Sequence, residues 1–120
     1  MFINFTNHQS SKWPQKQLAA AEIYGTVKDF PFPDVNPEND EGYINGLADY
    51  YTNEIIKHSP AAVLCQGEMT LAFAVARKLA MHNITVLAAC SSREVAEHVS
   101  PDGKTVKHVE FNFIRFRKYL

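Results

Sequence analysis

The sequence has little cysteine. Cys65 and Cys90 are its two cysteines, and both lie inside apolar runs, "AAVLCQG" and "TVLAACSS". A free cysteine in such a run behaves as a small buried hydrophobe, and unpaired thiols are typical of reducing compartments. We therefore expect two buried free thiols and a cytoplasmic protein.

An excess of charge and long apolar runs are also missing. The formal net charge is −1, whereas non-specific binding to duplex DNA needs a broad basic face. No apolar stretch approaches the roughly 20 residues that cross a bilayer. The start, "MFINFTNH", lacks the basic segment and apolar run of a signal peptide. We expect no DNA partner and no membrane partner.

The motifs that hold metals and phosphates are absent too. No two histidines or cysteines have the spacing of metal ligands. "QGEMT", residues 66–70, contains one glycine, whereas a P-loop or a dinucleotide fingerprint needs several at fixed spacing. We therefore expect neither a metal nor a cofactor.

What the sequence does contain is a regular alternation of short apolar runs with helical patterns. Strands are predicted at "FINF", "TVKDFPF", "AAVLC" and "TVLAAC", residues 2–5, 26–32, 61–65 and 85–90. Helices are predicted at residues 14–25, from near Glu38 to Ser59, and at 69–83. "SPDGK", residues 100–104, indicates the turn of a C-terminal β-hairpin. We expect a β-bulge near His108 in that hairpin.

This order of elements predicts an α/β fold, a Rossmann-like three-layer sandwich that forms a single domain over residues 1–120. Right-handed crossovers favour a parallel sheet of order 2-1-3-4, followed by the C-terminal hairpin. In such a sheet ligands bind beyond the carboxyl ends of the strands, at the point where the strand order reverses. That crevice would lie between the first and third strands.

Polar residues gather in the loops that border the predicted crevice. The candidate site residues are Asn7, His8, Ser10, Ser11, Lys12 and Trp13 after the first strand, Gln66, Gly67, Glu68 and Thr70 after the third, and Ser91, Ser92 and Arg93 after the fourth.

Several of these candidates also have a purely structural interpretation. Ser10 and Ser11 could cap the first helix, and Trp13 could pack beneath the loop rather than stack on a base. Glu68 could complement the dipole of the third helix, or accept a hydrogen bond from a base, a ribose hydroxyl or a water. Gly67 allows close approach of the backbone. The evidence for a site is the cluster.

The C-terminal segment "FNFIRFRKY" interleaves aromatic and basic residues. Such a strand can stack nucleobases, but more often it supplies an apolar face to the core or to a second subunit. We expect a homodimer with aromatic residues of the helices or of the hairpin at its interface.

At "FINFTNHQSSKW", "DFPFPDVNP", "AVLCQGEMTLAFAVARKL" and "FNFIRFRKY" the chain resembles small CRISPR-associated proteins of type III systems, the Rossmann-like sensor domains and ring nucleases that bind cyclic oligoadenylates. The resemblance implies a homodimer whose paired crevices hold a ring, with cyclic tetra-adenylate favoured. It also implies metal-independent cleavage, in which a 2′-hydroxyl attacks the adjacent phosphate. On this hypothesis His8 is the general acid, Glu68 and Lys12 complete the catalytic group, and Lys12 or Arg93 contacts phosphate.

Three alternatives remain open at this point. A protein that sequesters the ring without cutting it fits nearly as well, because no pair of general acid and base is visible. A nucleoside deoxyribosyltransferase-like enzyme would use Glu68 as its nucleophile, although a second carboxylate near the crevice is not evident. The third alternative is a purely structural dimer.

Overall fold

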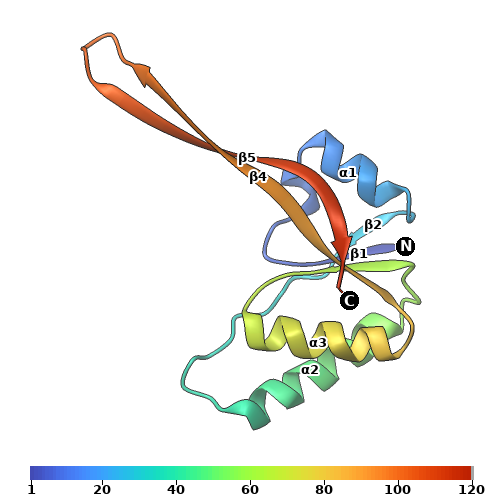
Figure 1. Cartoon of the computed structure of the whole chain (residues 1–120). Coiled ribbons are helices and arrows are strands. Elements are labelled where there is room, and N and C mark those ends of the chain that lie inside the picture. The colour runs from blue at the N-terminus through green and yellow to red at the C-terminus, as the bar shows by residue number, and fades with distance from the viewer. Residues whose placement is uncertain (120) are drawn as a thin grey trace.

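The computed structural model describes residues 1–119 and contains one five-stranded sheet with helices on both faces (Figure 1). Its elements are β1 (Phe2–Phe5), a 3₁₀ turn η1 (Ser10–Lys12), α1 (Gln15–Glu22), β2 (Val27–Asp29), α2 (Glu41–Ile56), β3 (Ala62–Cys65), α3 (Met69–Met81), β4 (Thr85–Val99) and β5 (Thr105–Lys118). The strand order is β2-β1-β3-β4-β5, with β5 antiparallel to β4 and the other neighbours parallel. The predicted order 2-1-3-4 and the C-terminal hairpin are confirmed.

The side chains of the central strands alternate between the two faces of the sheet, as the period of two in a strand requires. Ile3 and Phe5 belong to the core beneath α2 and α3. Phe2 and Leu64 belong to a smaller core on the opposite face, where α1 lies (Figure 1). All residues of β1 and β3 are buried, as their unbroken apolar runs predict for central strands.

Two predicted boundaries shift for identifiable reasons. α2 begins three residues later than expected, because the side chain of Asp40 accepts a hydrogen bond from the backbone N–H of Tyr43 and so caps the helix. β2 ends at Asp29 rather than at residue 32. The chain still runs alongside β1 and the residue after it, since the N–H groups of Phe30 and Phe32 donate to the carbonyl oxygens of Asn4 and Thr6, but the intervening proline has no N–H to donate.

The largest correction concerns the fourth strand, which continues without a break from Thr85 to Val99. The expected loop at Ser91, Ser92 and Arg93 is therefore wrong: these residues lie within β4. The expected bulge near His108 is also wrong, because the register shift lies between Cys90 and Ser91. The predicted turn is confirmed at residues 100–104, where Gly103 has a φ of 84°.

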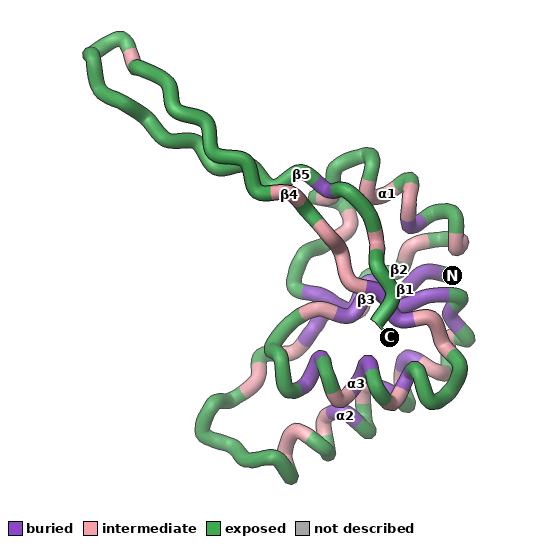
Figure 2. The backbone as a smooth tube through the Cα atoms, in the orientation of Figure 1, coloured by how far each residue is buried: buried purple, intermediate pink, exposed green. Residues whose placement is uncertain are grey.

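Beyond the register shift, residues 92–112 form a two-stranded arm that projects from the body of the molecule (Figures 1 and 2). Almost all of the arm is exposed (Figure 2). The radius of gyration is 17.2 Å, against about 14 Å for a compact chain of this length. The arm accounts for the elongated shape, with extents of 55 × 38 × 24 Å.

The two cysteines differ in environment. Cys65 is buried in β3, where desolvation raises the pKa of its thiol to about 12, so the predicted buried free thiol is confirmed there. Cys90 is free but only half-buried. Among residues 1–119 no helix has both the length and the apolar character needed to cross a membrane.

Candidate functional site

A cavity of about 750 Å³ opens at the carboxyl ends of β1 and β3. We call it the edge cavity. It occupies the position that the strand order predicts for a ligand crevice. Its lining residues come from the loop after β1, from α1, from the end of β3, and from β4 and β5: Thr6, Asn7, His8, Gln9, Lys12, Trp13, Pro14, Gln17, Leu64, Gln66, Gly67, Ala89, Ser91, Phe111 and Phe113.

A buried asparagine organises the loop after β1. The side-chain amide of Asn4, only 1% exposed, donates to the carbonyl oxygen of His8 at 2.8 Å. The hydroxyl of Thr6 donates to the Asn4 side-chain oxygen at 2.8 Å and accepts from the N–H of His8 at 3.1 Å. These bonds fix the backbone at His8, so its imidazole is carried on a loop of defined shape.

Asp29, at the end of β2, holds the next part of the same loop. One carboxylate oxygen accepts from the Asn4 amide at 2.8 Å and from the Ser10 N–H at 3.1 Å. The other accepts from the Ser10 hydroxyl at 3.1 Å. Ser10 therefore starts the 3₁₀ turn that presents Lys12, and it does not cap α1 as one prediction held, since Pro14 occupies the N-cap position of that helix.

Trp13 forms an aromatic wall of the edge cavity. Its indole packs edge-on against Phe2, with ring centroids 6.1 Å apart, and lies 6.4 Å from the ring of Phe116. It is half-buried and also lines the cavity. Core packing, the first interpretation of this residue, is confirmed, and one surface of the side chain remains available to a ligand.

Gln66 extends the sheet by means of its side chain. Its Oε1 accepts from the backbone N–H of Ala89 at 2.8 Å, past the point where β3 and β4 are paired. One residue earlier, the hydroxyl of Tyr119 donates to the carbonyl oxygen of Cys65 at 2.7 Å. Desolvation raises the pKa of Tyr119, and the neighbouring Cys65 adds to the shift. The end of β3 is thus held by β4 and by the chain after β5.

Gly67 has a packing role. A Cβ atom at this position would lie 2.5 Å from ring atoms of Phe32, which is buried and stacks on Phe5 with centroids 4.7 Å apart. The close approach predicted for this glycine therefore exists, and its partner is an aromatic ring of the core.

Glu68 caps α3. Its carboxylate accepts from the backbone N–H groups of Thr70 and Leu71 at 3.1 and 2.9 Å, and from the Thr70 hydroxyl at 2.8 and 2.7 Å. The hydrogen bond from the Thr70 side chain is the main cause that lowers the pKa of Glu68. The first free N–H groups of α3 are therefore occupied by a negative charge, which leaves no anion site there.

A protein-family model matches residues 1–117. The chain belongs to the uncharacterized protein MJ1673 family. Comparison with curated proteins gave no match, and comparison with solved structures gave none either. The description of the MJ1673 family names no activity.

In this MJ1673-family chain the edge cavity brings together about half of the candidate residues and leaves the others outside. Those that line it are Asn7, His8, Lys12, Trp13, Gln66, Gly67 and Ser91. Those that do not are Ser10, Ser11, Glu68, Thr70, Ser92 and Arg93. Arg93 lies beside the cavity rather than in it, because it pairs directly with Phe111 across the arm.

Four residues of the site were not predicted from the sequence. Asn4 and Asp29 hold the loop after β1, and Phe111 and Phe113 line the cavity from β5. Asn4 sits in an apolar strand, and its polarity was the available signal. Asp29 was hidden inside a predicted strand. Phe111 and Phe113 line the cavity because β5 returns along β4, and only the hairpin register brings them there.

Among residues 1–119, the titratable side chains that line the edge cavity are His8 and Lys12, and no carboxylate lines it. Within residues 1–119 no three His, Cys, Asp or Glu side chains form a group that could hold a metal ion. The lining combines amide groups, one imidazole, one ammonium group and three aromatic rings. This chemistry suits an anionic ligand that carries flat aromatic groups.

Proposed function

We propose that the edge cavity binds a cyclic oligoadenylate and that the protein is a metal-independent ring nuclease with a Rossmann-like fold. The observation that carries the proposal is the meeting of His8 and Lys12 with Trp13 and Phe111 in a cavity that no carboxylate of the described residues lines. The resemblance of the sequence to small CRISPR-associated ring nucleases supports the choice of adenylate. Cyclic tetra-adenylate is the first ring to test.

The aromatic and amide groups match the two parts of an adenosine. Trp13, Phe111 and Phe113 offer faces and edges on which a base can stack, an interaction worth roughly 1–3 kcal/mol per base. The side chains of Asn7 and Gln66 supply donors that reach adenine nitrogens or ribose hydroxyls. Since Gln66 already uses its oxygen on Ala89, its NH₂ group is the part left for a ligand.

The charged groups match the phosphates. Lys12 is exposed at the cavity, and an ammonium group is a common phosphate ligand. Arg93 pairs with Phe111 on the arm, so a second cation stands beside the aromatic rim. Because no carboxylate in the described part of the chain lines the cavity, no described side chain there repels a phosphodiester.

In the proposed reaction a ribose 2′-oxygen forms a bond to the adjacent phosphorus while the bond from phosphorus to the 5′-oxygen breaks. The 2′-proton passes to solvent, and His8 donates a proton to the departing 5′-oxygen. Lys12 stabilises the extra negative charge of the phosphorane. The products carry a 2′,3′-cyclic phosphate and a 5′-hydroxyl. The step uses no water as a nucleophile and involves no metal ion.

A second candidate function is sequestration of the ring without cleavage. It is favoured because, among residues 1–119, no carboxylate lines the cavity to act as a general base beside His8. A cavity that binds and orients the ring would still limit the concentration of a messenger. No observation favours the deoxyribosyltransferase-like alternative, since both carboxylate oxygens of Glu68 accept hydrogen bonds at the start of α3.

Two alanine variants test the proposal. We expect His8→Ala to lower the single-turnover rate by on the order of 10²–10⁴ and to keep the dissociation constant within about tenfold. We expect Lys12→Ala to weaken binding itself, with a larger difference at low salt because salt screens the attraction. Both quantities are measured on one preparation of each variant, with cyclic tetra-adenylate and a chelator present.

Lys16→Ala is the matched control, since Lys16 is exposed on α1 and does not line the cavity. It should change neither quantity. If His8→Ala damages binding and cleavage equally and also lowers the melting temperature, His8 is a packing residue. If the wild type binds the ring and never cuts it, sequestration replaces cleavage.

A further inference from the structure

A second surface, on α2 and α3, is unpartnered within the chain. Met69, Phe73, Arg77 and Met81 follow one another at intervals of four along α3, so they form one stripe on the outer side of the helix. Met69 is 82% exposed, Phe73 68% and Met81 73%. Large apolar side chains this exposed, aligned on one side of a helix, are typical of a surface that binds another protein.

The stripe is a ridge with a hollow on each side. We use the name α3 ridge for Phe73, Arg77 and Met81, which line both hollows. The hollow toward α2 has about 570 Å³, and the hollow over β4 and the end of β5 has about 730 Å³. A ridge between two grooves is the shape that packs against a copy of itself.

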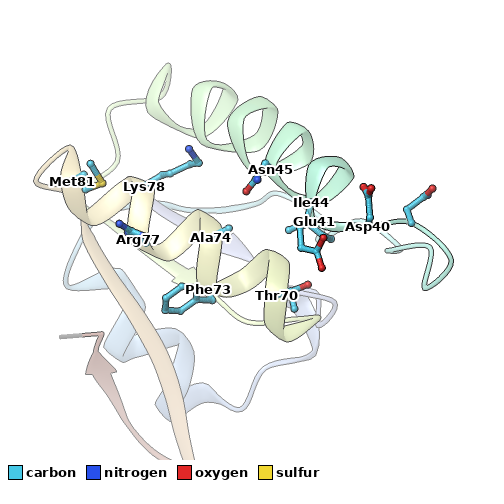
Figure 3. A pocket seen from close by; sticks show the side chains of 11 residues that line it. Asp40, Glu41, Ile44, Asn45, Thr70, Phe73, Ala74, Arg77, Lys78 and Met81 are labelled. Atoms are coloured by element: carbon cyan, nitrogen blue, oxygen red, sulfur yellow. The ribbon is translucent and has the colours of Figure 1, made fainter.

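The charges along the first hollow are separated (Figure 3). Asp40 and Glu41 lie at one end, where α2 begins, and Arg77 lies toward the other, with Phe73 between them (Figure 3). Lys78 is paired with Asp49 at 2.8 Å, whereas Arg77 has no ion-pair partner within residues 1–119. The patch is acidic at one end, apolar in the middle and basic at the other.

We propose that this patch is the interface of a homodimer, formed by the α3 ridges of two copies packed antiparallel about a two-fold axis. In a two-fold interface every contact occurs twice: if one residue of the first copy contacts another residue of the second, the second copy makes the same contact to the first. An antiparallel arrangement sets Arg77 of each copy against the acidic end of the other, and Phe73 enters the partner's groove. Both ends of the patch are then satisfied by a second copy of the same chain.

The arrangement has a consequence for the edge cavities. The helices that pack on this sheet run antiparallel to its parallel strands. If the two α3 helices of a dimer are antiparallel, the carboxyl edges of the two sheets therefore face in opposite directions. The edge cavities stay open at the two ends of the dimer, and each takes its own ligand. The paired crevices implied by the resemblance would need a different interface, through the arm.

The oligomeric state tests the proposal directly. Sedimentation equilibrium of the full chain at tens of micromolar should give about twice the 13.6 kDa of one chain. Arg77→Glu should raise the dissociation constant of the dimer at least tenfold, and Glu41→Arg should do the same, because like charges then face each other. The double variant should recover most of the wild-type affinity, since the pair re-forms with its signs exchanged.

Arg93→Glu is the matched control: it reverses an exposed arginine on the arm and should leave the dimer unchanged. Phe73→Glu is a second disrupting variant, and circular dichroism verifies that each variant is folded. A wild type that stays monomeric at 100 µM would overturn the proposal. So would a dimer that Arg93→Glu weakens while Arg77→Glu does not, because the interface would then be the arm.

Discussion

The carboxylate of Glu68 illustrates how one side chain sets the chemistry at the start of a helix. It accepts hydrogen bonds from the first N–H groups of α3, and both of its oxygens share the single hydroxyl proton of Thr70. Because these bonds favour the ionised form, the pKa of Glu68 lies below its ordinary value of 4.5. A group with a lowered pKa in the folded state stabilises the fold above the unfolded pKa, and the contribution is lost as the pH falls through the folded pKa.

We therefore expect Glu68→Ala to lower the free energy of unfolding by about 1 kcal/mol at pH 7, and by progressively less below pH 4.5. Urea denaturation at pH 7 and at pH 3 measures the two differences. Glu22→Ala, at the exposed end of α1, is the control and should have little effect at either pH. A loss of stability that is the same at both pH values would show that Glu68 acts through packing.

For single residues, the sequence predicts which polar residues lie at the site better than it predicts their hydrogen-bond partners. A polar loop after an apolar strand was visible, and four of its six expected site residues line the edge cavity: Asn7, His8, Lys12 and Trp13. The bonds from Asn4 and Thr6 to His8 were not visible, because they depend on a loop that folds back over its own strand. Asp29 reaches Ser10 from 19 residues away, and no local pattern encodes such a contact.

Among the elements, the arm differs most from the rest of the fold. An isolated two-stranded ribbon is marginally stable in water, and within residues 1–119 no third strand pairs with residues 92–112, almost all of which are exposed (Figure 2). We expect backbone amides of the arm to exchange with solvent faster than those of β1 and β3 by on the order of 10² or more. Hydrogen exchange followed by mass spectrometry of the full chain provides the measurement.

The same experiment separates the two possible dimers. With α3 ridges at the interface, amides of the arm exchange fast in the dimer, and dilution below the dissociation constant leaves them unchanged. If the arm were the interface, its amides would be protected in the dimer and would lose that protection on dilution. Protection of the arm would contradict the α3 ridge interface.

The arm also shows why element boundaries are hard to predict. The apolar run 85–90 gives way to "SSREVAEHV", whose polarity resembles a loop followed by an edge strand. The backbone continues as one strand because every residue from Arg93 to Val99 has a partner in β5. Pairing between segments up to 31 positions apart, such as Leu87 with Lys118, overrides the local signal. The strand order, by contrast, follows from the alternation of elements and the handedness of crossovers.

In the whole molecule, the edge cavity and the α3 ridge are separate surfaces of one body. The parallel strands end at the edge cavity, the arm extends its aromatic rim through Phe111, and α3 presents its ridge on a different face. Because the proposed interface leaves each edge cavity open, binding of a ring and dimerisation are separate events. Arg77→Glu should therefore leave the affinity of the protein for cyclic tetra-adenylate unchanged.

The proposed function is that the edge cavity binds and opens a cyclic oligoadenylate without a metal. The most direct test incubates the wild-type protein with cyclic tetra-adenylate in the presence of a chelator and follows the products by mass spectrometry. We expect linear products that end in a 2′,3′-cyclic phosphate, and a dissociation constant that Lys12→Ala raises. A wild-type protein that neither binds nor cuts any cyclic oligoadenylate from a panel of ring sizes would contradict the claim.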